Sequence, residues 1–293
     1  DRHNTYFMSK VNVLVTGGNG QLGQALQKAS VVHPELSFHF FGSADADVTN
    51  VQSLQSLFET VQPDFCINAA AYTAVDKAES EPEKAHLINV QGVANLAEVC
   101  NAYNTTLLHV STDFVFDGNG SVPYTESDST HPASVYGTTK LEGEKAIQSI
   151  AHKYFIVRTS WVYSEFANNF YKTMLRIGTP GATVRVVNDQ VGTPTNANDL
   201  AEALITIVKS NSTNYGIYHY SGEGQCSWYG FAKEIFAINK IDIDLHAIPT
   251  TDFPTPARRP AYSVMDKSKI EKEFGIAIPT WEERLKEMCA IAQ

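Results

Sequence analysis

Short runs of apolar, often β-branched residues alternate along the chain with longer segments whose apolar residues recur at helical spacing. Such runs are typical of buried parallel strands, and such segments are typical of amphipathic helices. The runs predict strands at 11–15, 38–41, 64–68, 107–110, 155–162, 183–187 and 216–220. The longer segments predict helices at 51–61, 79–100, 170–177, 197–209 and 228–238, and from 280 onward. This alternation predicts an α/β fold with a doubly wound parallel sheet of the Rossmann type.

A glycine-rich turn, TGGNGQLG at 16–23, joins the first predicted strand to an amphipathic helix. In a dinucleotide-binding turn, Gly17 permits the tight turn, Gly20 lets a pyrophosphate approach the backbone, and Gly23 lets the helix pack on the strand. The helix N-terminus, at Gln21 and Leu22, offers N–H groups to the phosphates. The GxxGxxG spacing points to short-chain reductase folds and predicts a nicotinamide cofactor, although a glycine turn without a ligand is the alternative.

The segment after the second predicted strand leaves the choice between NADPH and NADH open. A Rossmann strand usually ends in an acidic residue that binds the ribose 2′-hydroxyl, but Gly42 and Ser43 stand at this position. No carboxylate repels a 2′-phosphate there, and no nearby arginine demands one. We expect Asp47 and Val48 beside the adenine, with Asp47 as a helix cap for 51–61 as the alternative.

Three alanines, Ala69, Ala70 and Ala71, follow the third predicted strand. Their small side chains would let the nicotinamide ribose pass, and tight packing is the alternative explanation.

The stretch from Ser111 to Lys140 contains the candidate catalytic groups. Thr112 follows a predicted strand at its carboxyl end, where open α/β sheets bind ligands. Tyr136 and Lys140 lie four residues apart, which places both on one helix face. Thr112 would donate a hydrogen bond to a substrate carbonyl oxygen and Tyr136 would supply the proton. We expect Lys140 to lower the pKa of the phenol and to hold the nicotinamide ribose.

The positions of these elements predict two interleaved units. Residues 8–163 would form the Rossmann domain, to which 197–222 return. Residues 164–196 and 223–293 would form a smaller α/β substrate-binding lobe over the carboxyl edge of the sheet. Residues 1–7 are polar and precede Met8, so we interpret them as a tag remnant or a disordered extension.

Composition narrows the classes of partner. The formal net charge of -10 argues against nucleic acid and against an anionic membrane as partners. No apolar run approaches the ~18 residues of a membrane-spanning helix. The chain shows no secretory signal, and its four cysteines are scattered without CxxC spacing. These features predict a cytoplasmic protein with reduced thiols and no cysteine metal site.

A set of motifs in chain order carries a resemblance to a known family. The motifs are GGNGQLG (17–23), NAAAYTAVDKAE (68–79), STDFVFDG (111–118), VYGTTKLEGE (135–144), RTSWVY (158–163), NDQVGTPT (188–195) and PARRP (256–260). With them the chain resembles the extended short-chain dehydrogenase/reductase family, and more narrowly its dTDP-4-dehydrorhamnose reductases. The resemblance implies that NADPH or NADH reduces the 4-keto group of a dTDP-linked 4-keto-6-deoxysugar, dTDP-4-dehydro-6-deoxy-L-mannose.

The resemblance also assigns residues to the substrate, namely Thr73, Val75, Asp113, Phe114, Trp161, Asn168 and Arg259. Trp161 would stack on the deoxysugar, and Arg259 would pair with the nucleotide diphosphate. The residues alone leave other interpretations open, because Trp161 could be a core aromatic, Asn168 a helix cap and Arg259 part of the solvated surface.

Phe114 separates the reductases from their relatives. Related sugar-nucleotide dehydratases carry Asp-Glu after the threonine, whereas an apolar Phe114 cannot act as acid or base. Simple reduction is therefore favoured over an epimerase or a dehydratase. Another alternative is a non-catalytic relative, the regulatory β subunit of methionine adenosyltransferase, against which the intact Thr112, Tyr136 and Lys140 argue.

Some family members hold a divalent metal between subunits through carboxylates, one of them early in the first helix. This chain has no acidic residue in that helix before Glu35, so we predict no metal. A homodimer is a candidate assembly, and the oligomeric state stays open.

Overall fold

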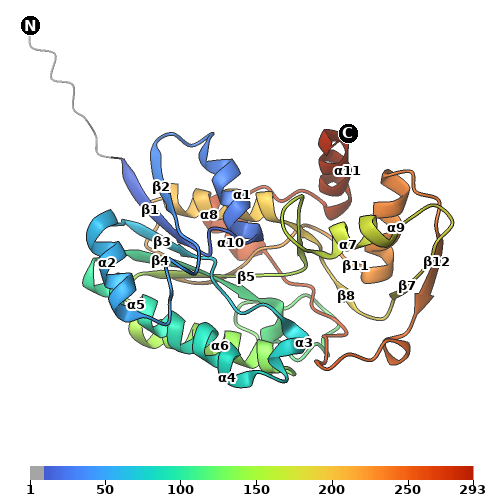
Figure 1. Ribbon diagram of the computed structural model, residues 1–293, viewed down its shortest axis with the longest axis horizontal. Coiled ribbons are helices and arrows are strands. Elements are labelled where there is room, and N and C mark those ends of the chain that lie inside the picture. The colour runs from blue at the N-terminus through green and yellow to red at the C-terminus, as the bar shows by residue number, and fades with distance from the viewer. Residues whose placement is uncertain (1–9, 293) are drawn as a thin grey trace, which may run out of the picture.

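A six-stranded parallel sheet lies at the centre of the computed structural model, which describes residues 10–292 (Figure 1). Residues 1–7, predicted to be a tag remnant or an extension, lie outside the described residues. The strands follow the order β10-β5-β4-β3-β1-β2. Their bounds are β1 (Val11–Thr16), β2 (Leu36–Phe40), β3 (Phe65–Asn68), β4 (Thr106–Thr112), β5 (Tyr154–Thr159) and β10 (Gly216–His219). The predicted α/β class with a doubly wound Rossmann-type sheet is confirmed.

The winding direction of the chain reverses at β1, which lies between β2 and β3. Such a switch point opens a crevice beyond the carboxyl ends of the strands, where ligands bind. Thr16 at the end of β1 is paired in register with Asn68 at the end of β3. The glycine turn and the alanine segment therefore leave the sheet side by side.

Helices cover both faces of this sheet (Figure 1). One face is covered by α1 (Gln21–Ser30), α8 (Ala197–Lys209) and α10 (Ser268–Phe274). The other is covered by α2 (Val51–Val61), α5 (Gly92–Ala102) and α6 (Val135–Ile150). The apolar face of each amphipathic helix is buried against the sheet, as Leu204 and Phe58 show on the two sides, since both are fully buried.

A smaller lobe lies beside the sheet, on the right of Figure 1. Its larger elements are α7 (Phe170–Ile177), β7 (Thr183–Val187), α9 (Trp228–Ile238), β12 (Asp244–Ile248) and α11 (Trp281–Ala292). Its short strands are β6 (Val162–Tyr163), β8 (Val191–Gly192), β9 (Thr195–Asn196) and β11 (Cys226–Ser227). The lobe has a core of its own, in which Tyr163, Phe231 and Leu285 are buried.

The remaining elements are short. They are the helices α3 (Val75–Ala78) and α4 (Pro82–His86), the π-helical turn η1 (Leu87–Gln91), and the 3₁₀ turns η2 (Asp113–Val115) and η3 (Thr250–Asp252). Within residues 10–292, no helix is long and apolar enough to cross a membrane.

The strand predicted at 155–162 is two strands, and the prediction was wrong on this point. β5 ends at Thr159, and Trp161 adopts a left-handed backbone with φ of 47°. The carbonyl of Trp161 accepts a hydrogen bond from the Thr195 N–H at 3.0 Å, and β6 pairs with β9. This pairing pulls the chain out of the main sheet at the point where the lobe begins.

The helix predicted at 79–100 is interrupted by the π-turn η1, between α4 and α5. α6 packs closely on this turn, because a Cβ on Gly143 would lie 2.3 Å from the Asn89 carbonyl oxygen. Such π-turns are frequent near functional sites.

The alternative role for Asp47 as a helix cap is also wrong, because Asn50 caps α2 through a hydrogen bond from the Ser53 N–H.

α10 packs on the main sheet, although the sequence placed it in the lobe with 223–293. Ile270 is fully buried in the sheet core. The Phe274 ring lies 5.9 Å from that of Phe155 and 5.2 Å from that of Tyr218. β10 is an edge strand, and α10 covers its apolar side chains. The short α10 segment has no sequence pattern that would reveal this contact.

We expect Ile270→Ala to lower the free energy of unfolding by about 2–5 kcal/mol, because the substitution leaves a cavity in the sheet core. Urea unfolding followed by circular dichroism measures this loss. Val32→Ala, at a side chain that is 69% exposed, is the control and should change the free energy by less than about 0.5 kcal/mol. An unchanged unfolding midpoint for Ile270→Ala would contradict the packing of α10 on the sheet.

Candidate active site

The glycine turn after β1 has the geometry of a phosphate-binding loop. Gly17 has a φ of +64°, and a Cβ there would lie 2.6 Å from the Ala69 carbonyl carbon, so only glycine fits. A Cβ on Gly23 would lie 2.4 Å from the Gly17 oxygen. A Cβ on Gly20 would meet only the Gly17 oxygen, at 3.4 Å. The backbone therefore needs Gly17 and Gly23, whereas the space at Gly20 is left for a ligand.

The N-terminus of α1 directs its N–H groups toward this space. Its first turn contains no acidic residue, and among the described residues no side chain caps it. The Gln21 side chain points away, since its Oε1 accepts a hydrogen bond from Ser164 Oγ at 2.8 Å, and Leu22 packs against the sheet core. The helix terminus thus fits a phosphate through its backbone N–H groups.

The segment after β2 keeps its carboxylate occupied. Asp47 accepts hydrogen bonds from the Thr49 N–H at 3.0 Å and the Thr49 hydroxyl at 2.6 Å. Val48 is buried, and its carbonyl accepts a hydrogen bond from Asn95 at 3.0 Å. These hydrogen bonds fix the turn, and an adenine beside Asp47 and Val48 stays a prediction.

The alanine segment after β3 is half-buried and held from both ends. Asn68 Oδ1 accepts hydrogen bonds from Thr16 Oγ1 at 2.7 Å and the Ala70 N–H at 3.3 Å. At the far end, the buried Asn89 side chain accepts from the Tyr72 N–H at 2.9 Å and donates to the Tyr72 carbonyl at 3.1 Å. Ala69, Ala70 and Ala71 therefore form a fixed wall of the crevice.

Asn89 also donates to Thr139 Oγ1 on α6 at 3.1 Å, so it links the alanine wall to the helix that carries Tyr136. Sequence reasoning missed this residue. An asparagine amid the apolar positions of a predicted helix was the only available signal.

Thr112, Tyr136 and Lys140 come together at the carboxyl end of β4. Ser134 caps α6 through a hydrogen bond from the Gly137 N–H at 3.0 Å, which fixes where the helix begins. The Thr112 hydroxyl donates to Asp113 Oδ1 at 3.1 Å and lies near the Tyr136 phenol, whose pKa it acts to lower. Lys140 Nζ donates to the Val110 carbonyl at 2.8 Å. The predicted trio is therefore assembled from one strand end and one helix face.

Phe114 touches the phenol from the side. Its ring centroid lies 5.4 Å from that of Tyr136 at an interplanar angle of 75°, an edge-on contact. Gly137 allows this approach, because a Cβ there would lie 2.3 Å from the Phe114 carbonyl oxygen. A side chain at this position could act as an acid or a base beside the phenol, but the apolar ring of Phe114 cannot.

Burial controls the protonation of these groups. It raises the pKa of Tyr136 to about 12, while the nearby Thr112 hydroxyl acts to lower this pKa and the Asp113 charge acts to raise it. It lowers the pKa of Lys140 to about 8, while the Glu144 carboxylate acts in the opposite direction. The expectation that Lys140 lowers the pKa of the phenol is wrong in this structure. The cost of burying a phenolate is the largest effect on this pKa, and the Lys140 ammonium is held at the Val110 carbonyl.

Asp113 is a buried carboxyl beside the trio. Its Oδ1 accepts a hydrogen bond from Thr112 at 3.1 Å, and within the described chain its Oδ2 has no hydrogen-bond partner. Burial raises the pKa of Asp113 to about 6, although nearby hydroxyls of Ser263 and Thr112 oppose the rise. An unpaired buried oxygen of this kind is suited to a polar ligand group.

Trp161 stands beside β5 as half of a stacked pair. Its ring lies 3.6 Å from that of Trp228, centroid to centroid, at 12°. On Gly192, a Cβ would lie 2.7 Å from Cε2 of Trp161. The predicted sugar-stacking wall is therefore a two-tryptophan unit, and sequence reasoning missed Trp228 because it lies 67 positions along the chain (228 minus 161).

The other predicted substrate residues lie at the margin. Arg259 forms a double ion pair with Asp76, at 2.7 and 2.9 Å, so a carboxylate already occupies the guanidinium predicted to bind a diphosphate. Thr73 is exposed, and Val75 begins α3 next to Asp76. Asn168 is exposed and is not the cap of α7, since Asn169 caps that helix.

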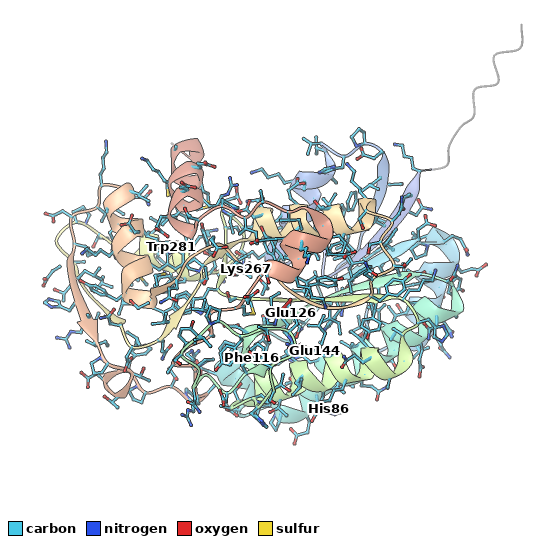
Figure 2. All side chains as sticks on the ribbon, turned by 180° about the vertical axis from the view of Figure 1, so that it is seen from behind. His86, Phe116, Glu126, Glu144, Lys267 and Trp281 are labelled. Carbon is cyan, nitrogen blue, oxygen red and sulfur yellow. The ribbon has the colours of Figure 1, made fainter. Side chains whose placement is uncertain are left out.

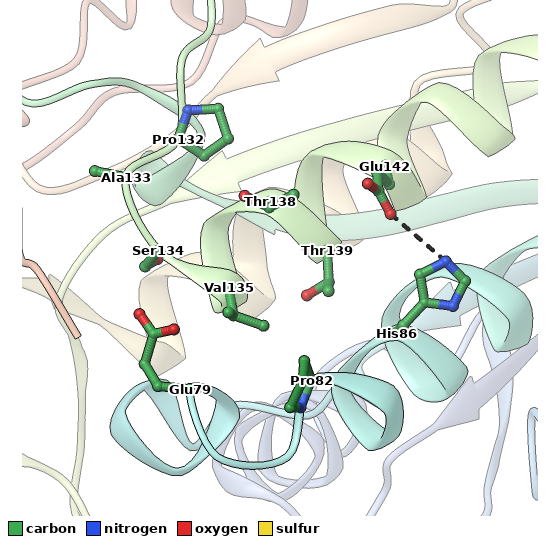
Figure 3. Close-up of a pocket in the computed structure, with 10 residues that line it drawn as sticks. All are labelled: Glu79, Pro82, His86, Pro132, Ala133, Ser134, Val135, Thr138, Thr139 and Glu142. Carbon is green, nitrogen blue, oxygen red and sulfur yellow. Dashed lines mark ion pairs between the residues drawn. The ribbon is translucent and has the colours of Figure 1, made fainter. Parts of the chain in front are cut away.

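A cavity of about 520 Å³ lies on the side of α6 away from the trio (Figure 3). Figure 3 shows Val135, Thr138 and Glu142 facing it, and Glu142 pairs with His86 across it at 3.6 Å. These positions repeat at helical spacing on another face than Tyr136 and Lys140. The cavity is therefore separate from the candidate active site.

Among residues 10–292, no three His, Cys, Asp or Glu side chains cluster closely enough to hold a metal ion. The predicted absence of a metal at a subunit interface stays a prediction.

Comparison with known proteins places this geometry in a family. Residues 11–293 match the model of the RmlD substrate binding domain. The chain is 42% identical to dTDP-4-dehydrorhamnose reductase of Aggregatibacter actinomycetemcomitans, over 96% of this chain and 99% of the relative. A crystal structure of a dTDP-4-dehydrorhamnose reductase from Clostridium acetobutylicum matches with a TM-score of 0.92 at 41% identity, covering 97% of this chain and all (100%) of that one. The Bacillus anthracis enzyme of the same name, crystallised in complex with NADP, matches with a TM-score of 0.93 at 36% identity and the same coverage, 97% and 100%.

We expect the stacked indoles of Trp161 and Trp228 to produce an exciton couplet in the far-ultraviolet circular dichroism spectrum, because parallel rings in contact couple their transitions. Trp161→Phe and Trp228→Phe should each abolish the couplet. Trp281→Phe, which changes the third tryptophan of the chain, is the control and should preserve it. A wild-type spectrum without the couplet would show that the two rings are not stacked in solution.

Proposed function

The chain belongs to the family of the RmlD substrate binding domain, and we propose that it reduces dTDP-4-dehydro-6-deoxy-L-mannose to dTDP-L-rhamnose with NADPH or NADH. The resemblance to dTDP-4-dehydrorhamnose reductases read from the sequence is confirmed by relatives of that name at about 40% identity over almost the whole chain. The observation that carries the proposal is the trio of Thr112, Tyr136 and Lys140 beside a phosphate-binding turn.

The crevice fits the nicotinamide cofactor that the family implies. The space at Gly20 and the free N-terminus of α1 would hold the pyrophosphate, and the alanine wall would lie along the nicotinamide ribose. Lys140 donates to Val110 and retains further N–H donors for ribose hydroxyls. When bound, the reduced nicotinamide supplies the hydride to the carbonyl carbon.

Thr112 and Tyr136 would handle the oxygen of the substrate carbonyl. Thr112 would donate a hydrogen bond to this oxygen and fix its position next to the phenol. Tyr136 would then donate its proton as negative charge develops on the oxygen. Because the raised pKa of about 12 keeps the phenol protonated at neutral pH, Tyr136 carries the proton that the reduction requires. A group that had to act as a base at neutral pH would need the opposite shift.

Phe114 supports reduction over elimination of water. Phe114 stands at the sequence position where the related dehydratases carry a second acidic residue, and its ring beside Tyr136 cannot transfer a proton. The epimerase and dehydratase alternatives therefore lack a necessary group. The non-catalytic alternative is disfavoured because all three members of the trio are present at the carboxyl end of β4.

We extend the proposal to the surroundings of this site. The substrate would lie between the sheet edge and the lobe, with its sugar near the Trp161 and Trp228 pair and its dTDP group toward Arg259. Arg259 would exchange Asp76 for the diphosphate or hold both. The cytoplasmic location and the homodimer stay predictions.

The central test supplies dTDP-4-dehydro-6-deoxy-L-mannose, made in situ by the upstream enzymes, and follows the absorbance of reduced nicotinamide. We expect oxidation of the cofactor and formation of dTDP-L-rhamnose. Tyr136→Phe should lower kcat by about 10²–10⁴-fold, because the proton donor is lost, while cofactor affinity stays near the wild-type value.

Tyr103→Phe is the matched control. It removes a phenol hydroxyl that contacts Glu59 and lies just before β4, at the end of the strand opposite to Thr112. Wild-type protein that binds the cofactor and oxidises none of it would favour the non-catalytic alternative, and full activity in Tyr136→Phe would remove the tyrosine from the mechanism.

The pH dependence should report Lys140. Its pKa is lowered to about 8, so the ammonium is present below that pH and is lost as the pH rises through it, whereas Tyr136 keeps its proton up to about 12. We therefore expect kcat/KM for reduction to fall above about pH 8. In Lys140→Arg the cation persists, and the fall should move to higher pH. A fall that stays near pH 8 in Lys140→Arg would assign it to another group.

A further inference from the structure

A buried ion pair lies directly behind the trio, and the proposed chemistry does not use it. Glu144 on α6 and Arg158 on β5 are only 1% and 2% exposed. Arg158 Nη2 donates to Glu144 Oε1 at 2.7 Å, and Arg158 Nε donates to Oε2 at 3.0 Å. Ser111 Oγ donates to the same Oε2 at 2.5 Å. The Glu144 carboxylate is therefore fully engaged in hydrogen bonds, one of them with Ser111, the strand residue that precedes Thr112.

Other groups hold the guanidinium of Arg158 in place. His219 Nδ1 donates to the Tyr124 carbonyl at 3.1 Å, so its Nε2 is left to accept from Arg158 Nη1 at 3.3 Å. Burial lowers the pKa of His219 to about 3, which keeps the ring neutral. The Arg158 guanidinium also lies 5.2 Å from the centroid of the Phe116 ring. Figure 2 labels Glu144 and Phe116, both of which the Arg158 guanidinium approaches.

An ion pair in such a place needs an explanation. Taking two charges out of water is expensive, and replacing a buried pair by apolar residues is often neutral or stabilising. Packing alone would therefore be served as well by two apolar side chains. Unlike an apolar residue, a carboxylate here accepts the Ser111 hydrogen bond and acts on neighbouring charges.

The neighbouring charge is Lys140, which lies four residues before Glu144 on the same face of α6. The other titratable groups around Lys140 are Tyr136 on α6, His109 on β4, Asp113 on η2 and, beyond Glu144, Arg158 on β5. Tyr136 keeps its proton, and burial lowers the pKa of His109 well below its usual value, so both are neutral. The charge of Asp113 acts on Tyr136.

We propose that Glu144 is a positioning residue that keeps the Lys140 ammonium charged and holds the α6 face of Tyr136 and Lys140 against the end of β4. Arg158 and Ser111 hold the Glu144 carboxylate in its place. The inference rests on the proposed function for its importance to catalysis, because a charged Lys140 is what the cofactor ribose would meet. The effect of the Glu144 carboxylate on the charge of Lys140 does not depend on any enzymatic activity.

The decisive measurement is the titration of Lys140 itself in the protein without cofactor. Isotope-labelled lysine side chains are followed by NMR as the pH is raised, and the signal missing in Lys140→Met identifies Lys140. In Glu144→Gln, which keeps the size of the side chain and removes its charge, we expect the Lys140 titration to move down by about one to three pH units.

Glu144→Gln leaves Arg158 unpaired and could prevent folding, so a double variant accompanies it. Glu144→Gln with Arg158→Met removes both charges of the pair. Because Glu144 is the nearer charge to Lys140, the titration should still move down in the double variant, by less than in the single one. A Lys140 titration at the wild-type pH in a folded Glu144→Gln or in the double variant would overturn the proposal.

Asp199→Asn is the matched control. It removes the carboxylate of another partly buried arginine pair, with Arg284 at 2.8 Å, which joins α8 to α11 away from Lys140. It should leave the Lys140 titration in place, and a shift as large as that in Glu144→Gln would overturn the specific role of Glu144. In active variants, the fall of kcat/KM at high pH should move with the Lys140 titration. If no keto sugar is reduced at all, the titration still decides the role of Glu144, so the two failures are distinct.

Discussion

The attachment of α6 to the last residues of β4 is the constraint on which the site depends. Lys140 binds the Val110 carbonyl, Glu144 binds the Ser111 hydroxyl, and the next strand residue is Thr112. Because Lys140 and Glu144 are one helical turn apart, the same helix face makes both contacts. The helix cannot turn or slide along the strand without breaking a buried hydrogen bond and a buried ion pair, so the phenol meets the threonine hydroxyl at a defined place.

The same burial that fixes the geometry sets the protonation states. A buried phenolate is costly, so Tyr136 holds its proton, and a buried ammonium is costly, so Lys140 titrates close to neutral pH. The first effect suits a proton donor in carbonyl reduction. The second makes the cation vulnerable, and a neighbouring carboxylate then matters more than it would on a solvated surface, where water screens such pairs.

Much of the site could be predicted because it depends on local rules. Gly17 and Gly23 are required by a positive φ and by close backbone approaches, and Tyr136 and Lys140 share a helix face by their spacing alone. Trp228 and Asn89 were missed because their roles arise from contacts between segments far apart in the chain. Neither residue type nor spacing indicates that an indole will stack on another across the lobe.

The sequence by itself determined the alternation of the main strands and helices, the glycine turn after β1, and the identity of the groups at the carboxyl end of β4. Each follows from periodicity, glycine conformation or residue spacing, which act over a few residues. Only the tertiary structure decided that α10 covers the sheet, that the chain leaves β5 at Trp161, and that the phenol pKa rises where its lysine neighbour predicted a fall. Those outcomes depend on how much water the fold excludes from each group and on which distant segment fills its place.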